Sequence, residues 1–293
     1  MNKKSLIIGA AFVDVIMDVP NMPTSGGDVT ADFKSNDVGG CAFNVYGAIK
    51  YSLGNGSADL FIPIGNGQYA QIVQKVMEKR SIQVLLRDQG KDNGWDLCLI
   101  EPSGERTFIT VPGIEQCWKD EWFDKIDLDD YDYFYLSGYE MEDEQAAKVI
   151  LSNLSKRNKG SYLLFDASPR ISYINRNILS KILKANTMVN ANQDEIGYLS
   201  NKDSLEEQSA DIYSKTYAPV MITLGAKGTY LYDKHGGRLI PGEKVKVVNT
   251  IGAGDTHCGG VIAGLQKGMG IDEAISLSNV LSAKVIQQEA GSL

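Results

Sequence analysis

Three small residues followed by an acid, Gly252-Ala253-Gly254-Asp255, precede a helix-forming segment near the C-terminus. Successive backbone N–H groups at a helix N-terminus bind anions, and the helix dipole reinforces them. A carboxylate beside such an anion cradle can deprotonate an alcohol while a phosphoryl group is held in place. Helix capping by Asp255 is the alternative interpretation, but capping does not require three small residues before the acid.

A second candidate motif is the pair Asn192 and Glu195, whose i, i+3 spacing would put an amide and a carboxylate on one helix face. An amide and a carboxylate suit a water-mediated Mg²⁺ site, because Mg²⁺ keeps several waters and takes few carboxylates. An ordinary capping pair at a helix start explains the same spacing. On the residues alone, capping is the favoured interpretation.

Polar and glycine positions also lie near the expected ends of strands. Asp14 follows the first apolar run, and Gly40 and Asn44 open the first helix. Ligands of open α/β sheets bind near the carboxyl ends of strands, and carboxylate and amide groups suit the hydroxyls of a polyol. The segment from Thr223 to Gly228 is a strand that runs into a Gly-rich turn, although it lacks the spacing of a Walker loop.

A competing motif is the GxGxxA pattern at Gly65, Gly67 and Ala70, with Asp88 about 20 residues on. It follows an expected strand and opens an expected helix, as in dinucleotide-binding proteins. A Rossmann oxidoreductase is therefore the alternative from another enzyme class.

Length and composition exclude several classes of protein. The 293 residues carry 29 Lys and Arg against 37 Asp and Glu, a net charge of -8, which argues against a nucleic-acid partner. No apolar run reaches 18 residues, so no membrane partner is expected. The four cysteines form no CxxC pair and only two histidines are present, which disfavours structural zinc. These features predict a reduced, cytoplasmic protein.

Strand-like and helix-like segments alternate along most of the chain. Strands are expected at 5–14, 58–64, 131–136, 161–167, 187–191 and 219–225, and another is expected to end at Val248. Helices are expected at 41–53, 68–80, 143–157, 174–184, 204–217, 253–267 and 271–288, with a hairpin at 229–241. This alternation predicts a mostly parallel sheet covered by helices on both faces.

Two segments, 25–38 and 95–111, interrupt the alternation. The second is expected to be a hairpin that turns at Pro102-Ser103-Gly104, and its arms could pair with the first segment in a small antiparallel sheet. Such an excursion often forms a lid over a site, although a plain edge extension would have the same pattern.

Taken together, these motifs resemble the ribokinase-like family, the PfkB-type carbohydrate and nucleoside kinases. The resemblance covers essentially the whole chain and follows the family's order, in VGGCAFN (38–44), GERTF (104–108), NxxE, TLGxxG and TIGAGDT (250–256). The chain is similar to the family's bacterial members described only as uncharacterised sugar kinases. The resemblance implies a single domain over 1–293, a three-layer α/β/α sandwich with a small β lid from segments of about 15–38 and 95–111.

The resemblance also implies a role for each matching position. Asp255 would be the general base, beside an anion hole formed by Gly252, Ala253 and Gly254. The acceptor would be held by Asp14, Gly40 and Asn44, with Arg106 and Arg170 as further candidates. ATP would be bound by Thr223, Gly225, Gly228 and Asn279, and Mg²⁺ through water by Asn192 and Glu195.

The expected reaction is transfer of the ATP γ-phosphoryl group to a primary hydroxyl of a furanose-like sugar. A nucleoside kinase, including the pseudouridine type, and a non-catalytic sugar-binding homologue are the alternatives beside the oxidoreductase. Many sugar kinases of the family carry Asp where this chain has Asn249, so a monovalent cation is expected to act weakly. Family members are often dimers joined through their lids, and they usually continue past the position of Leu293. We therefore expect a homodimer, and a nucleotide site that is incomplete at its C-terminal edge.

Overall fold

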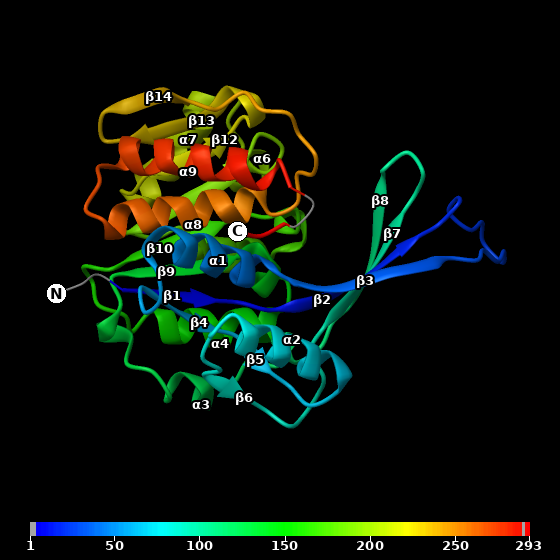
Figure 1. Ribbon diagram of the computed structural model, residues 1–293. Helices are drawn as coiled ribbons and strands as arrows, with labels where there is room; N and C mark the ends of the chain where they lie inside the picture. Colours follow the sequence, from blue (N-terminus) through cyan, green and yellow to red (C-terminus); the bar gives the residue numbers. More distant parts are fainter. Residues whose placement is uncertain (1–3, 289–290) are drawn as a thin grey trace. The chain divides into compact units, whose positions relative to one another are not determined.

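The structure, a computed structural model, describes residues 4–288 and 291–293. The chain divides into two compact units (Figure 1). The large unit comprises Met1–Gly9, Cys41–Phe61 and Trp118–Leu293, and the small unit comprises Ala10–Gly40 and Ile62–Cys117. Both predicted lid segments, 15–38 and 95–111, therefore lie wholly in the small unit.

The large unit is built on an eight-stranded sheet with the order β14-β13-β12-β11-β10-β9-β1-β4. The first six strands along the chain are parallel, and the hairpin β13–β14 is antiparallel. The strands are β1 (Ser5–Ile8), β4 (Ala58–Phe61), β9 (Tyr133–Ser137), β10 (Tyr162–Asp166), β11 (Thr187–Asn192), β12 (Val220–Thr223), β13 (Gly228–Asp233) and β14 (Gly236–Pro241).

Helices cover both faces of this sheet because its crossovers run in two opposite directions. From β9 to β12 each strand adds on the same side, so right-handed crossovers put the intervening helices on one face. The connection from β1 to β4 runs the other way and puts its helix on the other face, where the last two helices pack beside it (Figure 1). The first face carries α4 (Glu144–Leu154), α5 (Arg176–Ile182) and α7 (Leu205–Thr216), and the second carries α1 (Cys41–Leu53), α8 (Ala253–Gln266) and α9 (Ile271–Val285).

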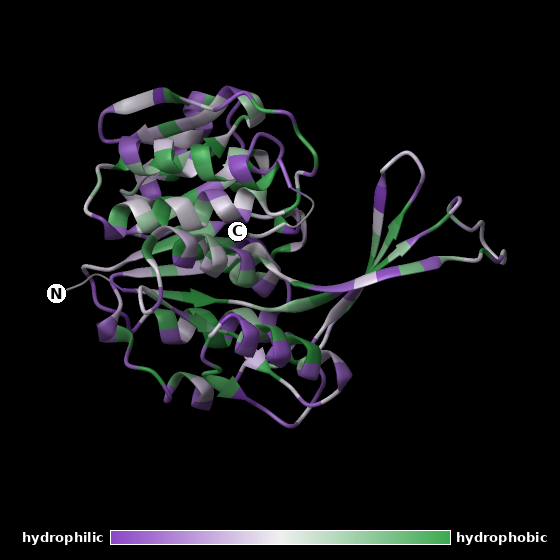
Figure 2. Cartoon of the chain, viewed as in Figure 1, coloured by the Kyte–Doolittle hydropathy of each residue, from purple (hydrophilic) through white to green (hydrophobic). Residues whose placement is uncertain are grey.

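The apolar strands of the large sheet form the core of the large unit. All four residues of β1 and all five of β9 are buried, as expected for parallel strands covered on both faces. Figure 2 shows hydrophobic residues along the strands of this sheet. The predicted sheet class is confirmed. Short helical turns complete the large unit: α3 (Asp120–Phe123), η2 (Leu128–Asp130), η3 (Gly138–Met141), η4 (Ile171–Tyr173), α6 (Ile196–Leu199) and η5 (Gly225–Lys227).

The small unit has its own four-stranded sheet, ordered β3-β2-β7-β8. The predicted direct pairing of the two excursions is wrong, because β2 lies between them, antiparallel to β3 and parallel to β7. The hairpin β7–β8 turns at Pro102-Ser103-Gly104 as predicted. The elements are β2 (Phe12–Asp18), β3 (Asp32–Gly39), β5 (Pro63–Ile64), α2 (Gln68–Lys79), β6 (Leu86–Arg87), β7 (Trp95–Ile100), β8 (Arg106–Val111) and η1 (Ile114–Gln116).

Two predicted strands are also corrected. The apolar run 5–14 is not one strand: β1 ends at Ile8 and β2 begins at Phe12, each in a different sheet. No polar residue marks that break, so hydrophobicity alone could not locate it. No strand ends at Val248, because β14 stops at Pro241 and the N–H groups of Val248 and Asn249 donate to the carbonyl of Ile286 beyond α9.

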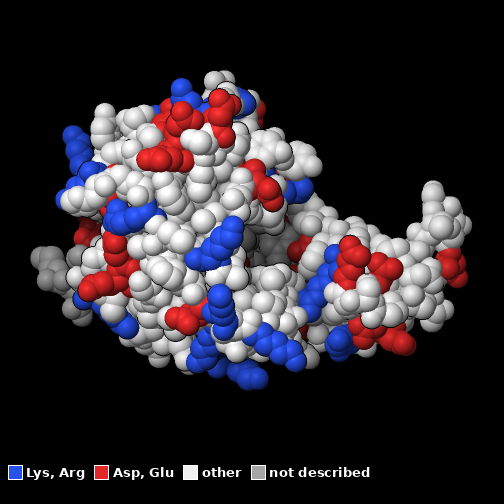
Figure 3. Space-filling view, turned by 90° about the horizontal axis from the view of Figure 1, so that it is seen from above, with Lys and Arg blue, Asp and Glu red and all other residues white. Residues whose placement is uncertain are grey.

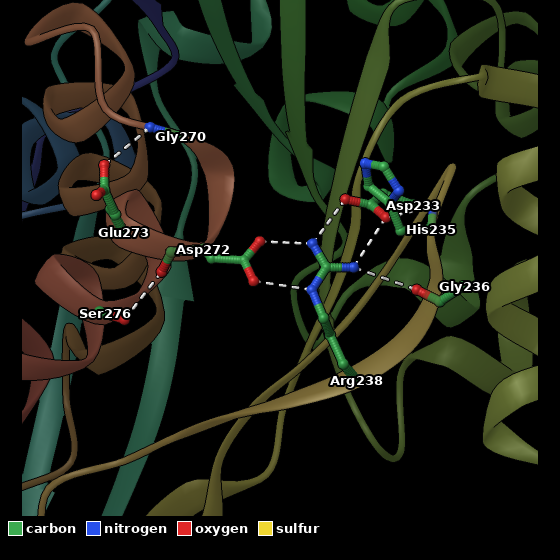
Figure 4. A network of polar contacts seen from close by, with 8 residues as sticks. All are labelled: Asp233, His235, Gly236, Arg238, Gly270, Asp272, Glu273 and Ser276. Carbon is green, nitrogen blue, oxygen red and sulfur yellow. Dashed lines mark hydrogen bonds and ion pairs between the residues drawn. The ribbon is translucent and has the colours of Figure 1, made fainter.

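The surface is charged but mixed, with acidic, basic and uncharged side chains interspersed on the face drawn in Figure 3. At the sheet edge Arg238 of β14 donates to the carboxylates of Asp233 in β13 and Asp272 in α9 (Figure 4). This bidentate arrangement ties the hairpin β13–β14 to the first turn of α9. Among the described residues, no helix has the length and apolar character needed to cross a membrane.

Candidate active site

The carboxyl ends of the parallel strands collect polar side chains at one edge of the large sheet. Asp166 ends β10, Asn192 ends β11 and Thr223 ends β12. Because neighbouring parallel strands end at the same edge, these residues face the region where α/β proteins bind ligands.

The start of α8 is shaped by its glycines. Gly252 precedes the helix with a φ of 73°, and a Cβ there would lie 1.8 Å from the carbonyl oxygen of Gly291, so only glycine fits. A Cβ on Gly254 would meet nothing within 4 Å, which means that this residue borders open space. The N–H of Ala253 donates to the carbonyl of Thr250 at 3.3 Å, whereas those of Gly252 and Gly254 have no hydrogen-bond partner among the described residues.

Asp255 lies in the first turn of α8 and is buried. Its Oδ2 accepts a hydrogen bond from the Nδ2 of Asn44 in α1 at 2.9 Å, and the Cys41 thiol also bonds its carboxylate. Burial raises the pKa of Asp255, and these two hydrogen bonds partly oppose that rise. The sequence predicts that Asn44 contacts the substrate that accepts the phosphoryl group. In the structure, Asn44 also orients the carboxylate of Asp255.

A second buried carboxylate, Asp166, was missed as a site residue by the sequence analysis. Its Oδ1 accepts from the Nδ2 of Asn190 at 2.8 Å. Burial, followed by the charge of Asp255, raises the pKa of Asp166 to about 7, while the hydrogen bond from Asn190 lowers it. Asp166 lies near the end of the strand predicted at 161–167, and that position could have identified it from the sequence. Asp255 and Asp166 thus form one electrostatically coupled carboxylate cluster.

Asn192 and Glu195 meet, but not on a helix face as predicted. Asn192 is the last residue of β11, and Glu195 precedes α6. The Asn192 N–H donates to Oε2 of Glu195 at 2.9 Å, and the Asn192 Oδ1 accepts from the N–H groups of Asp194 and Glu195. This reciprocal pair matches the capping geometry that the residues alone favoured. The Oε1 of Glu195 makes no hydrogen bond within the described residues and stays available to water or a ligand.

The Gly-rich turn after β12 is sterically constrained. Gly228 has a φ of 103°, and a Cβ there would lie 2.1 Å from the carbonyl oxygen of Ile240. Gly225, by contrast, borders open space. Asn279 of α9 is buried, with Nδ2 donating to the carbonyls of Ile240 and Pro241 and Oδ1 accepting from Thr229. Both Nδ2 hydrogens are therefore engaged, whereas Oδ1 can accept a second bond, and a contact between Asn279 and adenine stays a prediction.

In the small unit, three carboxylates lie across three paired strands. Asp14 of β2 is registered with Asp37 of β3 on one side and Asp96 of β7 on the other. Burial, followed by the charges of Asp96 and Asp37, raises the pKa of Asp14 to about 7, while Arg106 lowers it. Gly40 has a φ of 98°, and a Cβ there would lie 2.8 Å from the carbonyl oxygen of Ala10. The charge of Arg106 thus acts on the carboxylate of Asp14.

The pfkB family carbohydrate kinase pattern matches residues 2–293. The chain belongs to this family of kinases. It is a phosphotransferase that acts on a hydroxyl group, and its family uses ATP.

Relatives of this kinase cover nearly its whole length. An uncharacterised sugar kinase, YegV, of Escherichia coli is 31% identical over 98% of this chain and 89% of its own. Adenosine kinase of Saccharomyces cerevisiae is 26% identical over 85% of this chain and 78% of its own. The ribokinase structure from Thermotoga maritima superposes with a TM-score of 0.85 over 99% of this chain and 95% of its own, at 22% identity, which shows a shared fold.

Membership of this kinase family overturns the oxidoreductase alternative, and the structure gives the physical reason. The helix start after Gly65 and Gly67 is already occupied by an anion of the chain itself. The carboxylate of Asp92 accepts from the N–H groups of Tyr69 (3.1 Å) and Ala70 (2.7 Å). The preceding strand β5 has only two residues and pairs with β6 outside the large sheet. A pyrophosphate group would have to displace Asp92.

Two further side chains of this kinase have partners in the fold. The Nε of Arg170 lies 2.9 Å from Oε2 of Glu142, and its guanidinium stacks on the ring of Tyr173. This pair engages Nε and leaves the Nη donors for the predicted substrate contact, which stays a prediction. His257 is buried with Nε2 2.9 Å from Oγ1 of Thr229, and burial lowers its pKa to about 4, so the ring is neutral. All four cysteines are free thiols.

Proposed function

We propose that this kinase transfers the γ-phosphoryl group of ATP to a primary hydroxyl of a furanose-like sugar, with Asp255 as general base. The observation that carries the proposal is the buried Asp255 carboxylate in the first turn of α8, held by Asn44 beside the unpartnered N–H groups of Gly252 and Gly254. A base and an anion cradle in one helical turn match the two needs of phosphoryl transfer to an alcohol.

In the proposed step, the acceptor oxygen bonds to the γ-phosphorus as the bond to the ADP oxygen breaks. Asp255 takes the hydroxyl proton, and its raised pKa strengthens it as a base. The N–H groups of Gly252 and Gly254 stabilise the negative charge on the moving phosphoryl group, helped by the dipole of α8. Ala253 would join them once its weak bond to Thr250 is exchanged.

The nucleotide and metal are assigned to neighbouring strand ends. We place ATP against Thr223, Gly225 and Gly228, where the open space at Gly225 leaves room beside the turn. Mg²⁺ would be held through water by Glu195, whose Oε1 is unbonded within the described chain, with Asn192 fixing that side chain. When bound, the ion neutralises phosphate charge. Asp14, Gly40 and Asn44 are assigned to the acceptor, with Arg106 as a further candidate.

A nucleoside is the second candidate acceptor, favoured by Asn249. Some nucleoside kinases of this family carry Asn there, and adenosine kinase is among the relatives. A coupled assay of ADP release across pentoses, hexoses, ketoses and nucleosides tests both candidates. We expect turnover on at least one furanose-like sugar. Turnover on nucleosides alone would select the second candidate, and substrate binding without ADP release would leave a non-catalytic homologue.

The raised pKa of Asp14 predicts a pH-dependent acceptor affinity. Ionised Asp14 accepts hydrogen bonds through both oxygens, and its pKa of about 7 means that this form is lost as the pH falls below 7. We therefore expect the acceptor KM to rise by about tenfold for each pH unit below 7 and to level off above pH 8. In Asp14→Asn, KM should be high and independent of pH, whereas kcat should keep its own pH profile. An unchanged KM profile in that variant would refute the assignment.

Asn249 predicts weak activation by K⁺. Its Oδ1 already accepts from the N–H of Ile251 at 3.0 Å and brings no negative charge. Neutral oxygens alone compete poorly with the hydration of a monovalent cation. Titration with KCl against choline chloride should change turnover less than about twofold, whereas Asn249→Asp should gain apparent K⁺ affinity. Strong activation of the unmodified kinase at low millimolar K⁺ would contradict this prediction.

We also propose that the small unit's four-stranded sheet serves as a lid and joins two copies of the chain. Its strands expose large apolar side chains, namely Phe33, Phe108, Ile109 and Val111. Ile109 and Val111 are two residues apart in β8 and so share one face of the sheet, and exposed apolar side chains on one face mark an interaction surface. Sedimentation velocity should show a dimer that Ile109→Lys converts to monomer. The control Leu239→Lys, an equally exposed apolar strand residue of the large unit, should stay dimeric. A monomeric unmodified chain would overturn the proposal.

A further inference from the structure

A cavity of about 740 Å³ lies between the C-terminal ends of α4 and α5, where β10 and β11 begin. It shares no lining residue with the Asp255 cluster, which lies at the other ends of those strands. Its volume falls within the range of small-molecule sites. The cavity belongs wholly to the large unit.

All charged side chains that line this cavity are positive. The chain carries a net charge of -8, yet five cationic residues and no acidic residue line this cavity: Lys148, Arg157, Lys159, Lys181 and Lys184. Lys148 pairs with Glu144 at 3.4 Å. Within the described residues, Lys159, Lys181 and Lys184 form no ion pair. Concentrated like charge in a concave surface attracts anions from solution.

Arg157 supplies a donor without a protein partner. Its Nη1 donates to the carbonyl of Leu154 at 3.0 Å, but its Nε is buried and has no hydrogen-bond partner in the described part of the chain. Because this Nε is closed off from solvent, a ligand in the cavity would contact the guanidinium through its remaining Nη hydrogens. An arginine is also suited to the planar oxygens of a phosphate.

Helix stabilisation explains part of this charge. Lys181 lies in the last turn of α5, where a cation favours the helix dipole. The i,i+4 pair with Glu144 likewise accounts for Lys148. Neither effect explains Lys159, which follows α4 by five residues. The remaining lining includes apolar atoms of the half-buried Leu151 and the exposed Ala185, whereas Leu154, Leu163 and Ile182 are almost fully buried.

We propose that this cavity binds a small organic phosphate, whose phosphate group is held by Arg157 and the three unpaired lysines. Its non-phosphate part would pack on Leu151 and Ala185. Organic phosphates should therefore bind more tightly than inorganic phosphate, which can use only the charged part of the lining.

Calorimetric titration of the full chain with inorganic phosphate, a pentose 5-phosphate and adenosine monophosphate tests the proposal. The key variant carries Lys159→Glu, Lys181→Glu and Lys184→Glu, three exposed positions. The control carries Lys125→Glu, Lys234→Glu and Lys267→Glu, which change the net charge equally at exposed positions outside the cavity. We expect organic phosphate affinity to fall by about tenfold or more in the first variant only, because it loses charge-assisted contacts.

Either organic phosphate can also enter the active site, and the difference between the two triple variants isolates the cavity. Equal affinity of both variants for each phosphate would overturn the proposal, as would inorganic phosphate binding as tightly as the organic phosphates. Thermal melting reports whether the first variant is folded. If it is not, the single substitution Lys159→Glu replaces it, and an unchanged affinity there would count equally against the cavity.

Discussion

Asp255→Asn should lower kcat by about 10²–10⁴-fold while ATP and acceptor binding stay nearly unchanged, since this is the usual contribution of a positioned base. The Asn side chain has the same shape and can still accept the hydrogen bond from Asn44, so the first turn of α8 is preserved. It cannot take the acceptor proton. Steady-state kinetics with ATP and the acceptor identified by the ADP-release screen would measure the loss.

Asp203→Asn is the matched control, because Asp203 is an exposed acid at the start of another helical segment. Its kcat should equal that of the unmodified chain. A fall of less than about tenfold in Asp255→Asn would assign Asp255 to capping instead of catalysis.

Gly254→Ala should lower kcat by about 10²-fold, near the cost of losing one donor from an oxyanion hole, without destabilising the protein. A Cβ at this position meets no protein atom within 4 Å, so the methyl group enters the open space beside the cradle. Ala is also a better helix former than Gly, by about 1 kcal/mol. Thermal melting together with kinetics separates the two effects.

Gly252→Ala provides the contrast. The φ of 73° and the clash with the Gly291 carbonyl should destabilise this variant by about 1–3 kcal/mol, so its loss of activity should come with a lower melting temperature. Full activity in Gly254→Ala would mean that the moving phosphoryl group does not approach this turn.

The sequence determined the fold class and the most informative motif because both depend on local patterns. Alternating apolar strands and amphipathic helices require a covered parallel sheet, and Gly252 to Asp255 mark a helix start whichever residues pack on it. The limits of α1 and the hairpin at Pro102-Ser103-Gly104 were predictable for the same reason.

Tertiary structure alone decided which polar groups meet. Asn44 and Asp255 are 211 residues apart, and only the packing of α1 on α8 brings the amide to the carboxylate. Asp92 fills the helix start after Gly67 from 25 positions away, so a motif that fits dinucleotide binding locally is closed by a distant side chain. The raised pKa of Asp166 has the same origin, since burial and neighbouring charge are properties of the packed molecule and leave no trace in the spacing of residues.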